Sequence, residues 1–100
     1  MSELTSNTPD PDYSQALAEG WLPIREVARI TGVNAVTLRA WERRYGLIIP
    51  HRTAKGHRLF SEAHVLRIRQ ILTWLNRGVS VSQVKPLLDT KPAYSEPIDN

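Results

Sequence analysis

The chain is 100 residues long and contains no cysteine. That length suits one small domain, and the lack of thiols excludes disulfides, thiolate metal sites and cysteine nucleophiles. The sequence has no apolar run near the ~20 residues of a membrane span and no leader pattern at its N-terminus. We therefore expect a cytoplasmic protein.

The formal net charge of +3 conceals an uneven distribution of charged residues. Residues 21–88 contain twelve Arg or Lys against three Asp or Glu, a balance of plus nine, whereas the flanks hold Lys91 against seven acids, a balance of minus six. A basic core between acidic ends indicates a polyanionic partner. No stretch combines lysines with bulky apolar residues on one amphipathic helix, so a membrane surface is not the expected partner.

Residues 1–20 are polar, acidic and poor in large apolar side chains. Such a segment buries too little apolar surface to offset its ordering entropy. We expect a disordered or loosely docked acidic tail, in which Tyr13, Ala16 and Leu17 form at most one helical turn.

A helix-turn-helix is predicted over residues 23–45. Pro23 suits the start of a first helix, because its missing N–H would be unpaired there. Gly32 can end that helix in the left-handed conformation, and Asn34 can cap a second helix. Two helices joined by about three residues around a glycine are typical of this motif, whose second helix usually reads DNA.

The second helix, residues 34–45, has two different faces on a helical wheel. Leu38, Trp41 and Tyr45 fall on one side, which we expect to be buried. An arginine can pair bidentately with guanine, and a small apolar residue can contact a thymine methyl, so the opposite side suits the major groove. That opposite side comprises Val36, Arg39, Ala40 and Arg43, flanked by Thr37 and Arg44.

Residues 47–60 predict a two-stranded hairpin with its turn at 53–56. We expect Leu59 or Phe60 to point into the core. Cationic side chains on a short ribbon beside a recognition helix suit phosphate contacts, although charge on an exposed hairpin can also serve to prevent edge pairing. The side chains expected to project from the ribbon are Arg52, Lys55, His57 and Arg58.

Two more helices follow, the longest beginning after Ser61 and ending at Gly78. In the last one Pro86 removes a backbone hydrogen bond, so we expect that helix to be kinked or to end early. The predicted fold is mainly α with a small β-hairpin: a winged helix-turn-helix of about four helices and a two-stranded wing. It occupies residues 21–89, and residues 90–100 are expected to be a linker.

The segment VARITGVNAVTLRAWERRYGL, followed by P-x-R-T-x-x-G-H-R-L-F-S, closely resembles the N-terminal DNA-binding domain of MerR-family transcription regulators. The resemblance covers residues 22 to about 88. Ala40 and Trp41 stand where many members have two tyrosines, and Pro23 stands where a Ser or Thr cap is common. The form LRAWERRYG with GHR looks like the branch with a cobalamin-binding, often light-responsive, second domain, and like curli and biofilm regulators.

The resemblance implies a sequence-specific module of a dimeric regulator that acts on a palindromic operator in the nucleoid. In this family Arg39, Ala40 and Arg43 would enter the major groove. Members continue into a coiled-coil dimerisation helix and an effector domain, which nothing after Asp89 can supply. We therefore expect an excised, monomeric domain with no cofactor of its own, cobalamin belonging to a missing C-terminal domain. RNA polymerase is a further candidate partner.

Two other functions fit the same residues. One is an architectural DNA-binding protein of the excisionase kind, which shares this small winged fold. The other is a docking module whose basic face binds an acidic, DNA-mimicking protein of the antirepressor type. An enzyme is not expected, because His51, His57 and His64 are spread over the ribbon and a helix start without a completing carboxylate pair.

Overall fold

The computed structural model describes residues 10–90 of the chain, so the first nine residues of the expected tail and the expected linker after residue 90 lie outside it. Within this range the chain forms five helices and one two-stranded antiparallel hairpin, which confirms a mainly helical winged helix-turn-helix. No helix among these residues is long and apolar enough to cross a bilayer. The elements are α2 (Pro11–Ala18), α3 (Ile24–Thr31), α4 (Ala35–Arg43), β1 (His51–Arg52), β2 (Arg58–Leu59), α5 (Glu62–Asn76) and α6 (Val81–Thr90).

Helices α3 and α4 form the expected helix-turn-helix. Helix α3 begins directly after Pro23 and ends at Gly32, which takes the left-handed conformation with φ 79°. Asn34 caps α4, and its Oδ1 accepts a hydrogen bond from the Thr37 N–H at 2.8 Å. The start and end of α3 and the start of α4 therefore lie at the residues that the sequence predicts.

One hydrophobic core joins α3, α4, α5, α6 and the base of the hairpin. Leu38 and Phe60 are 1% exposed and Trp41 is 5% exposed, while Tyr45 packs against the core from its edge. This arrangement confirms the buried side of α4. Removing each such side chain from water contributes roughly 1.5–3 kcal/mol to stability, so the core determines how α4 is rotated.

The hairpin is shorter than the apolar run at residues 47–50 suggests. Leu47 and Ile48 are buried in the core instead of being paired in the ladder. A single bridge between Leu22 and Phe60 attaches β2 to the segment that precedes α3. The antiparallel pairs of the ladder are His51 with Leu59 and Arg52 with Arg58.

Helix α6 continues through Pro86, so of the two expected outcomes, a kink or an early end, the early end does not occur. Pro86 is exposed whereas Val84 is fully buried, which places the proline ring on the solvent side. One turn further on, the carboxylate of Asp89 pairs with Arg67 of α5 and with Lys85, each at 2.9 Å. Core packing and these ion pairs hold the helix together past the backbone hydrogen bond that Pro86 removes.

An additional helix, α2, precedes the helix-turn-helix where the sequence predicts at most one turn. Asp10 is its N-cap and Pro11 its first residue, a combination that favours a helix start. Ala16 is the buried residue of α2. The helix is therefore held by little apolar packing.

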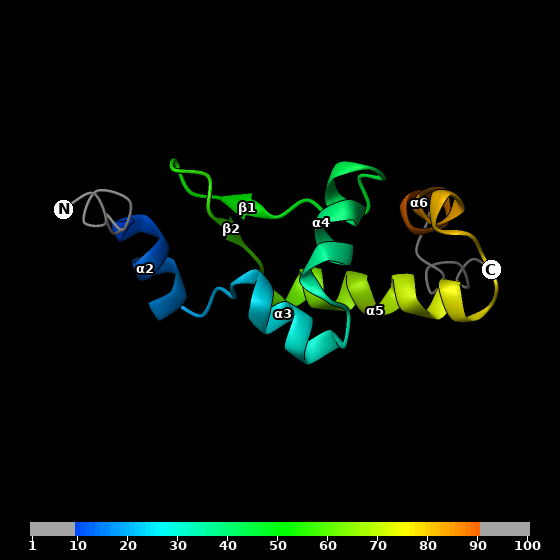
Figure 1. The fold of residues 1–100 in the computed structure, drawn as a ribbon, viewed down its shortest axis with the longest axis horizontal. Coiled ribbons are helices and arrows are strands. Elements are labelled where there is room, and N and C mark those ends of the chain that lie inside the picture. Colours follow the sequence, from blue (N-terminus) through cyan, green and yellow to red (C-terminus); the bar gives the residue numbers. More distant parts are fainter. Residues whose placement is uncertain (1–9, 91–100) are drawn as a thin grey trace, which may run out of the picture.

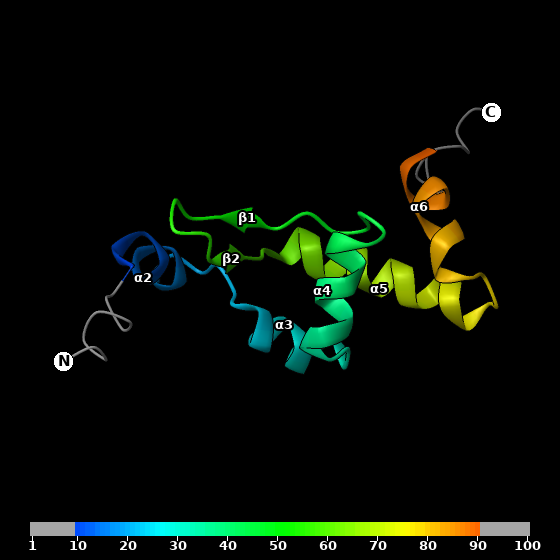
Figure 2. The same ribbon diagram turned by 45° about the horizontal axis from the view of Figure 1, so that its top comes forward.

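Helix α4 lies between the hairpin on one side and α6 on the other, in both views of the molecule (Figures 1 and 2). Helix α5 passes behind α4 in these views and forms the back of the domain. The hairpin and α6 thus flank α4 on opposite sides.

Candidate nucleic-acid interface

The outer face of α4 presents the side chains that the helical wheel assigns to it. Val36 is 71% exposed, Arg39 and Arg43 are exposed, and Ala40 is half-buried. The ion pairs formed within residues 10–90 engage neither of these two guanidinium groups. Two exposed guanidinium groups can donate to base edges, and the small apolar side chains beside them can contact thymine methyls.

Thr37 and Arg44 flank this face. Thr37 is half-buried and its backbone N–H is taken by the Asn34 cap, which leaves its hydroxyl and methyl for other contacts. Arg44 is exposed, and its guanidinium carbon lies 5.7 Å from the centroid of the Tyr45 ring. A cation over an aromatic face is weakly attracted to it, so the Tyr45 ring holds the Arg44 guanidinium near the end of α4.

Glu42 connects α4 to the hairpin. Its Oε1 accepts from Arg58 Nε and its Oε2 from Arg52 Nη2, both at 2.7 Å. Partial burial acts to raise the pKa of Glu42, but the hydrogen bonds from Arg58 and Arg52 outweigh it and lower the pKa below its ordinary value. We call this charged group of Glu42, Arg52 and Arg58 the Glu42 brace.

The brace changes what the two wing arginines present to solvent. Arg58 does not project as the sequence predicts: its side chain is only 15% exposed, and its Nη2 is buried without a hydrogen-bond partner among residues 10–90. Glu42 draws it inward because a carboxylate satisfies a guanidinium that would otherwise be desolvated. Arg52 is 39% exposed and also donates to the Gly56 carbonyl at 2.8 Å, so it remains within reach of a ligand.

The tip of the hairpin carries Lys55, which is exposed, and His57, which is engaged by α2. The Oδ2 of Asp10 lies 2.7 Å from both His57 Nδ1 and Thr53 Oγ1. The Tyr13 ring stacks on the His57 ring with centroids 4.6 Å apart. The hydrogen bond from Thr53, followed by that from His57, lowers the pKa of Asp10 to about 2. Asp10 is therefore a carboxylate at physiological pH.

The sequence interpretation missed the roles of Glu42 and Asp10. Glu42 is the one acid in an otherwise basic helix, and such an exception is a signal that an ion pair forms. Asp10 followed by Pro11 is a sequence signature of a helix start. Neither signal names the partners, because the partners lie between 10 and 47 positions away in sequence.

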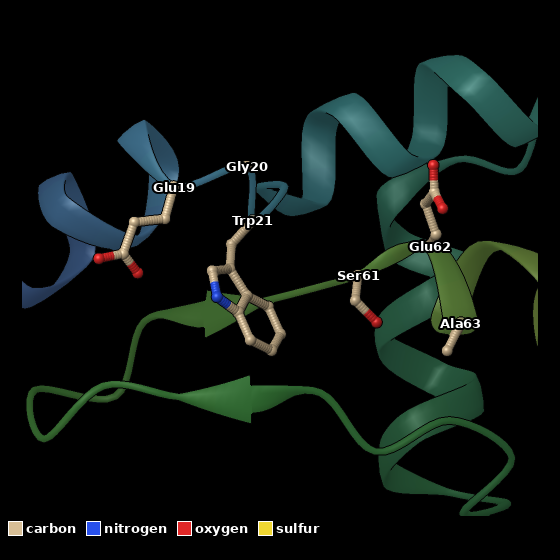
Figure 3. A pocket seen from close by; sticks show the side chains of 6 residues that line it. All are labelled: Glu19, Gly20, Trp21, Ser61, Glu62 and Ala63. Atoms are coloured by element: carbon tan, nitrogen blue, oxygen red, sulfur yellow. The ribbon is translucent and has the colours of Figure 1, made fainter.

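A hollow elsewhere in the described part of the chain has no cationic side chain in its lining. A cavity of about 340 Å³ lies between the end of α2 and the start of α5. In Figure 3 the indole of Trp21 lies over the hairpin, with the carboxylates of Glu19 and Glu62 on either side of it and both pointing away from the indole. Within residues 10–90 no three His, Cys, Asp or Glu side chains gather as metal ligands. The two remaining histidines, His51 and His64, stack edge to face at 6.0 Å.

The fold and the cationic surface together define a winged helix-turn-helix DNA-binding domain. The second helix of the motif presents arginines, a hairpin lies beside it, and one core supports both. Comparison with known proteins then identifies the family. Residues 22–91 match the MerR HTH family of regulatory proteins, and the chain belongs to that family.

Curated relatives and solved structures agree with this assignment. The HTH-type transcriptional regulator MlrA of Salmonella typhimurium is 57% identical over 67 residues, which are 67% of this chain and 28% of that protein. The repressor CarH of Myxococcus xanthus is 36% identical over 72% of this chain and 24% of its own length. The N-terminal part of MtaN, the Bacillus subtilis multidrug transporter activator, superimposes with a TM-score of 0.64 at 30% identity, over 76% of this chain and 71% of that one. The chain thus spans about 28% of the curated relative MlrA.

Proposed function

We propose that this chain binds double-stranded DNA in a sequence-specific manner, as the N-terminal module of a dimeric transcription regulator. The observation that supports this proposal most strongly is that α4 and the hairpin lie on one side of the core and are joined there by the Glu42 brace. An α-helix fits the major groove, and a ribbon held at a fixed position beside it reaches the adjacent backbone. The proposal also makes this a binding protein without an enzymatic site.

In this proposal the outer face of α4 reads the bases. Arg39 and Arg43 donate to guanine edges, while Val36 and Ala40 let the helix approach and contact thymine methyls. Thr37 and Arg44 lie at the borders of the face and contact the sugar-phosphate backbone. Both guanidinium groups of the face are exposed, so they need no rearrangement to bind.

The hairpin supplies contacts to phosphates. Lys55 at the tip is exposed, and Arg52 keeps part of its guanidinium outside the brace. Arg58 acts differently from the sequence prediction, because it holds the hairpin against α4. Phosphate contacts of this kind set the orientation of the protein on DNA without distinguishing sequences.

We propose a homodimer acting on a palindromic operator, with one half-site for each α4 and a dimer element outside residues 10–90. The names of the relatives favour a regulator over an excisionase-like architectural protein: MlrA is a transcriptional regulator and CarH a repressor. Under this proposal the protein binds its operator in the nucleoid.

The test is a titration with DNA followed by amide chemical shifts. Selection from a pool of random duplexes first yields a preferred half-site, which is then added to the isotopically labelled chain. We expect shift changes to gather on the outer face of α4 and on the hairpin, while the exposed residues Leu66 and Arg69 of α5 stay unchanged. Changes centred on α5 would place the DNA on the other side of the domain and refute the proposal.

A further inference from the structure

The contact between α2 and the hairpin tip occupies the carboxylate of Asp10 completely. Its Oδ1 accepts from the backbone N–H groups of Asp12 at 3.2 Å and Tyr13 at 3.4 Å, which caps α2. Its Oδ2 accepts from Thr53 and His57, both at 2.7 Å. The Asp10 side chain is 3% exposed. A carboxylate of this chain therefore sits buried at the end of the wing.

Thr53 and His57 form an anion site on the hairpin. Thr53 is the first residue of its turn and His57 directly follows the turn. The Thr53 N–H donates to the His57 carbonyl at 3.1 Å, and the His57 N–H donates to Thr53 Oγ1 at 3.2 Å. The turn thus holds a hydroxyl donor and an imidazole nitrogen in fixed positions. Both groups are common donors to phosphate oxygens in DNA complexes as well as to carboxylates. Lys55 extends the same tip with a free ammonium group.

We propose that Asp10 is a displaceable occupant of a phosphate site at the wing tip, so that α2 restrains DNA binding until a backbone phosphate replaces the carboxylate. The inference rests on the proposed function, because it names the ligand of one part of the same surface. In this inference residues 10–19, which lie outside the region matched by the family, control DNA binding by that surface.

The weakness of the α2 packing makes displacement feasible. The helix has eight residues and buries only Ala16, whereas isolated helices shorter than ~12 residues are marginal in water. Beyond its cap, the bonds that hold Asp10 and Tyr13 to the wing are two hydrogen bonds and one stacked ring pair. A segment with so little buried apolar surface belongs to the least stable part of a fold.

The negative charge of α2 predicts that the docked helix weakens DNA binding. Residues 10–19 carry Asp10, Asp12 and Glu19 and no Lys or Arg. While α2 is docked, Asp10 lies against the hairpin, and the net negative charge of α2 opposes the approach of DNA phosphates. The carboxylate of Asp10 also neutralises the attraction that a protonated His57 would exert on the backbone. Docked α2 therefore lowers affinity for every DNA sequence, since phosphate contacts are independent of base sequence.

The test compares Asp10→Asn with Asp12→Asn in the 100-residue chain. Asparagine is also a good N-cap, so Asp10→Asn keeps α2 while removing the charge that holds His57. Asp12 is exposed, and among the described residues its carboxylate makes no hydrogen bond or ion pair with the wing, so Asp12→Asn controls for the general change in charge. Affinity for a random 20-base-pair duplex at low salt is read by fluorescence anisotropy.

We expect Asp10→Asn to bind the duplex about three- to tenfold more tightly than the wild-type chain, and Asp12→Asn to gain clearly less. His57→Gln should lose more affinity in the Asp10→Asn background than in the wild type, because only there is the imidazole already free. Nuclear Overhauser contacts between the Tyr13 and His57 rings should disappear when the wild-type chain is saturated with duplex.

The outcomes separate this inference from the function on which it rests. Binding of the wild type with equal gains for the two variants, or a loss for Asp10→Asn, would overturn displacement and leave DNA binding in place. Persistence of the Tyr13–His57 contacts in the saturated complex would overturn it as well. Failure of every variant to bind duplex would overturn both the inference and the proposed function.

Discussion

Leu38 and Val36 lie two positions apart on α4, yet one is 1% exposed and the other 71%. Two steps of an α-helix turn the chain by about 200°, so neighbours at this spacing face opposite sides. Leu38 belongs to the core and Val36 to the surface proposed to contact bases. Burial therefore separates Leu38, which maintains the fold, from Val36, which is proposed to contact DNA.

Truncating these two residues gives a matched pair of variants. Leu38→Ala should reduce the free energy of unfolding by about 2–5 kcal/mol, because it leaves a cavity in a packed core. Val36→Ala should change it by less than about 0.5 kcal/mol, since an exposed side chain has little packing to lose. Urea unfolding followed by tryptophan fluorescence measures both. Equal stability of the two variants would mean that α4 is rotated differently about its axis.

At the scale of elements, the Glu42 brace determines how the hairpin stands against α4. Glu42 reaches Arg52 and Arg58, one on each strand, through charge-assisted hydrogen bonds. Such bonds are roughly twice as strong as neutral ones. The two-residue strands β1 and β2 have few ladder bonds of their own, so the orientation of the wing depends on this side chain.

Glu42→Gln tests the brace with almost no change in shape. The amide cannot neutralise two arginines, one of them mostly buried, so we expect a loss of about 1–3 kcal/mol in the free energy of unfolding. Amide hydrogen exchange across β1 and β2 should accelerate as well. Glu26→Gln is the control: its carboxylate pairs with Arg29 on the surface of α3, where ion pairs contribute little. Identical behaviour of the two variants would contradict a structural role for Glu42.

The elements differ in how far the sequence could predict them. Local signals set α3, α4 and α5, because a capping residue or a glycine in the left-handed conformation acts within a few positions. The predicted ribbon is confirmed for the same reason, its turn being encoded in residues 53–56. Helix α2 was underestimated because its docking depends on Thr53 and His57, more than 40 positions away. The sequence predicts an outward Arg58 because its pairing with Glu42 exists only once the hairpin is folded onto α4.

At the scale of the whole molecule, ion pairs within the chain determine which Arg and Lys side chains remain available to contact DNA. Among residues 10–90, five cations have acidic partners: Arg29 with Glu26, Arg52 and Arg58 with Glu42, and Arg67 and Lys85 with Asp89. On α4 and the hairpin, by contrast, Arg39, Arg43, Arg44 and Lys55 are exposed. Of the seven Arg or Lys side chains without an acidic partner in residues 10–90, these four lie where the domain is proposed to meet DNA, and the other three, Arg25, Arg69 and Arg77, lie on α3 and at α5. Binding should therefore weaken with added salt.

The most direct measurement of base reading by α4 compares Arg39→Ala with Lys55→Ala on two duplexes, the selected half-site and a random sequence. We expect Arg39→Ala to cost about 1–3 kcal/mol on the selected duplex and little on the random one, because guanine contacts depend on sequence. Lys55→Ala should weaken both duplexes alike and reduce the salt slope by about one. Equal losses on the two duplexes for Arg39→Ala would contradict the assignment of α4 to the major groove.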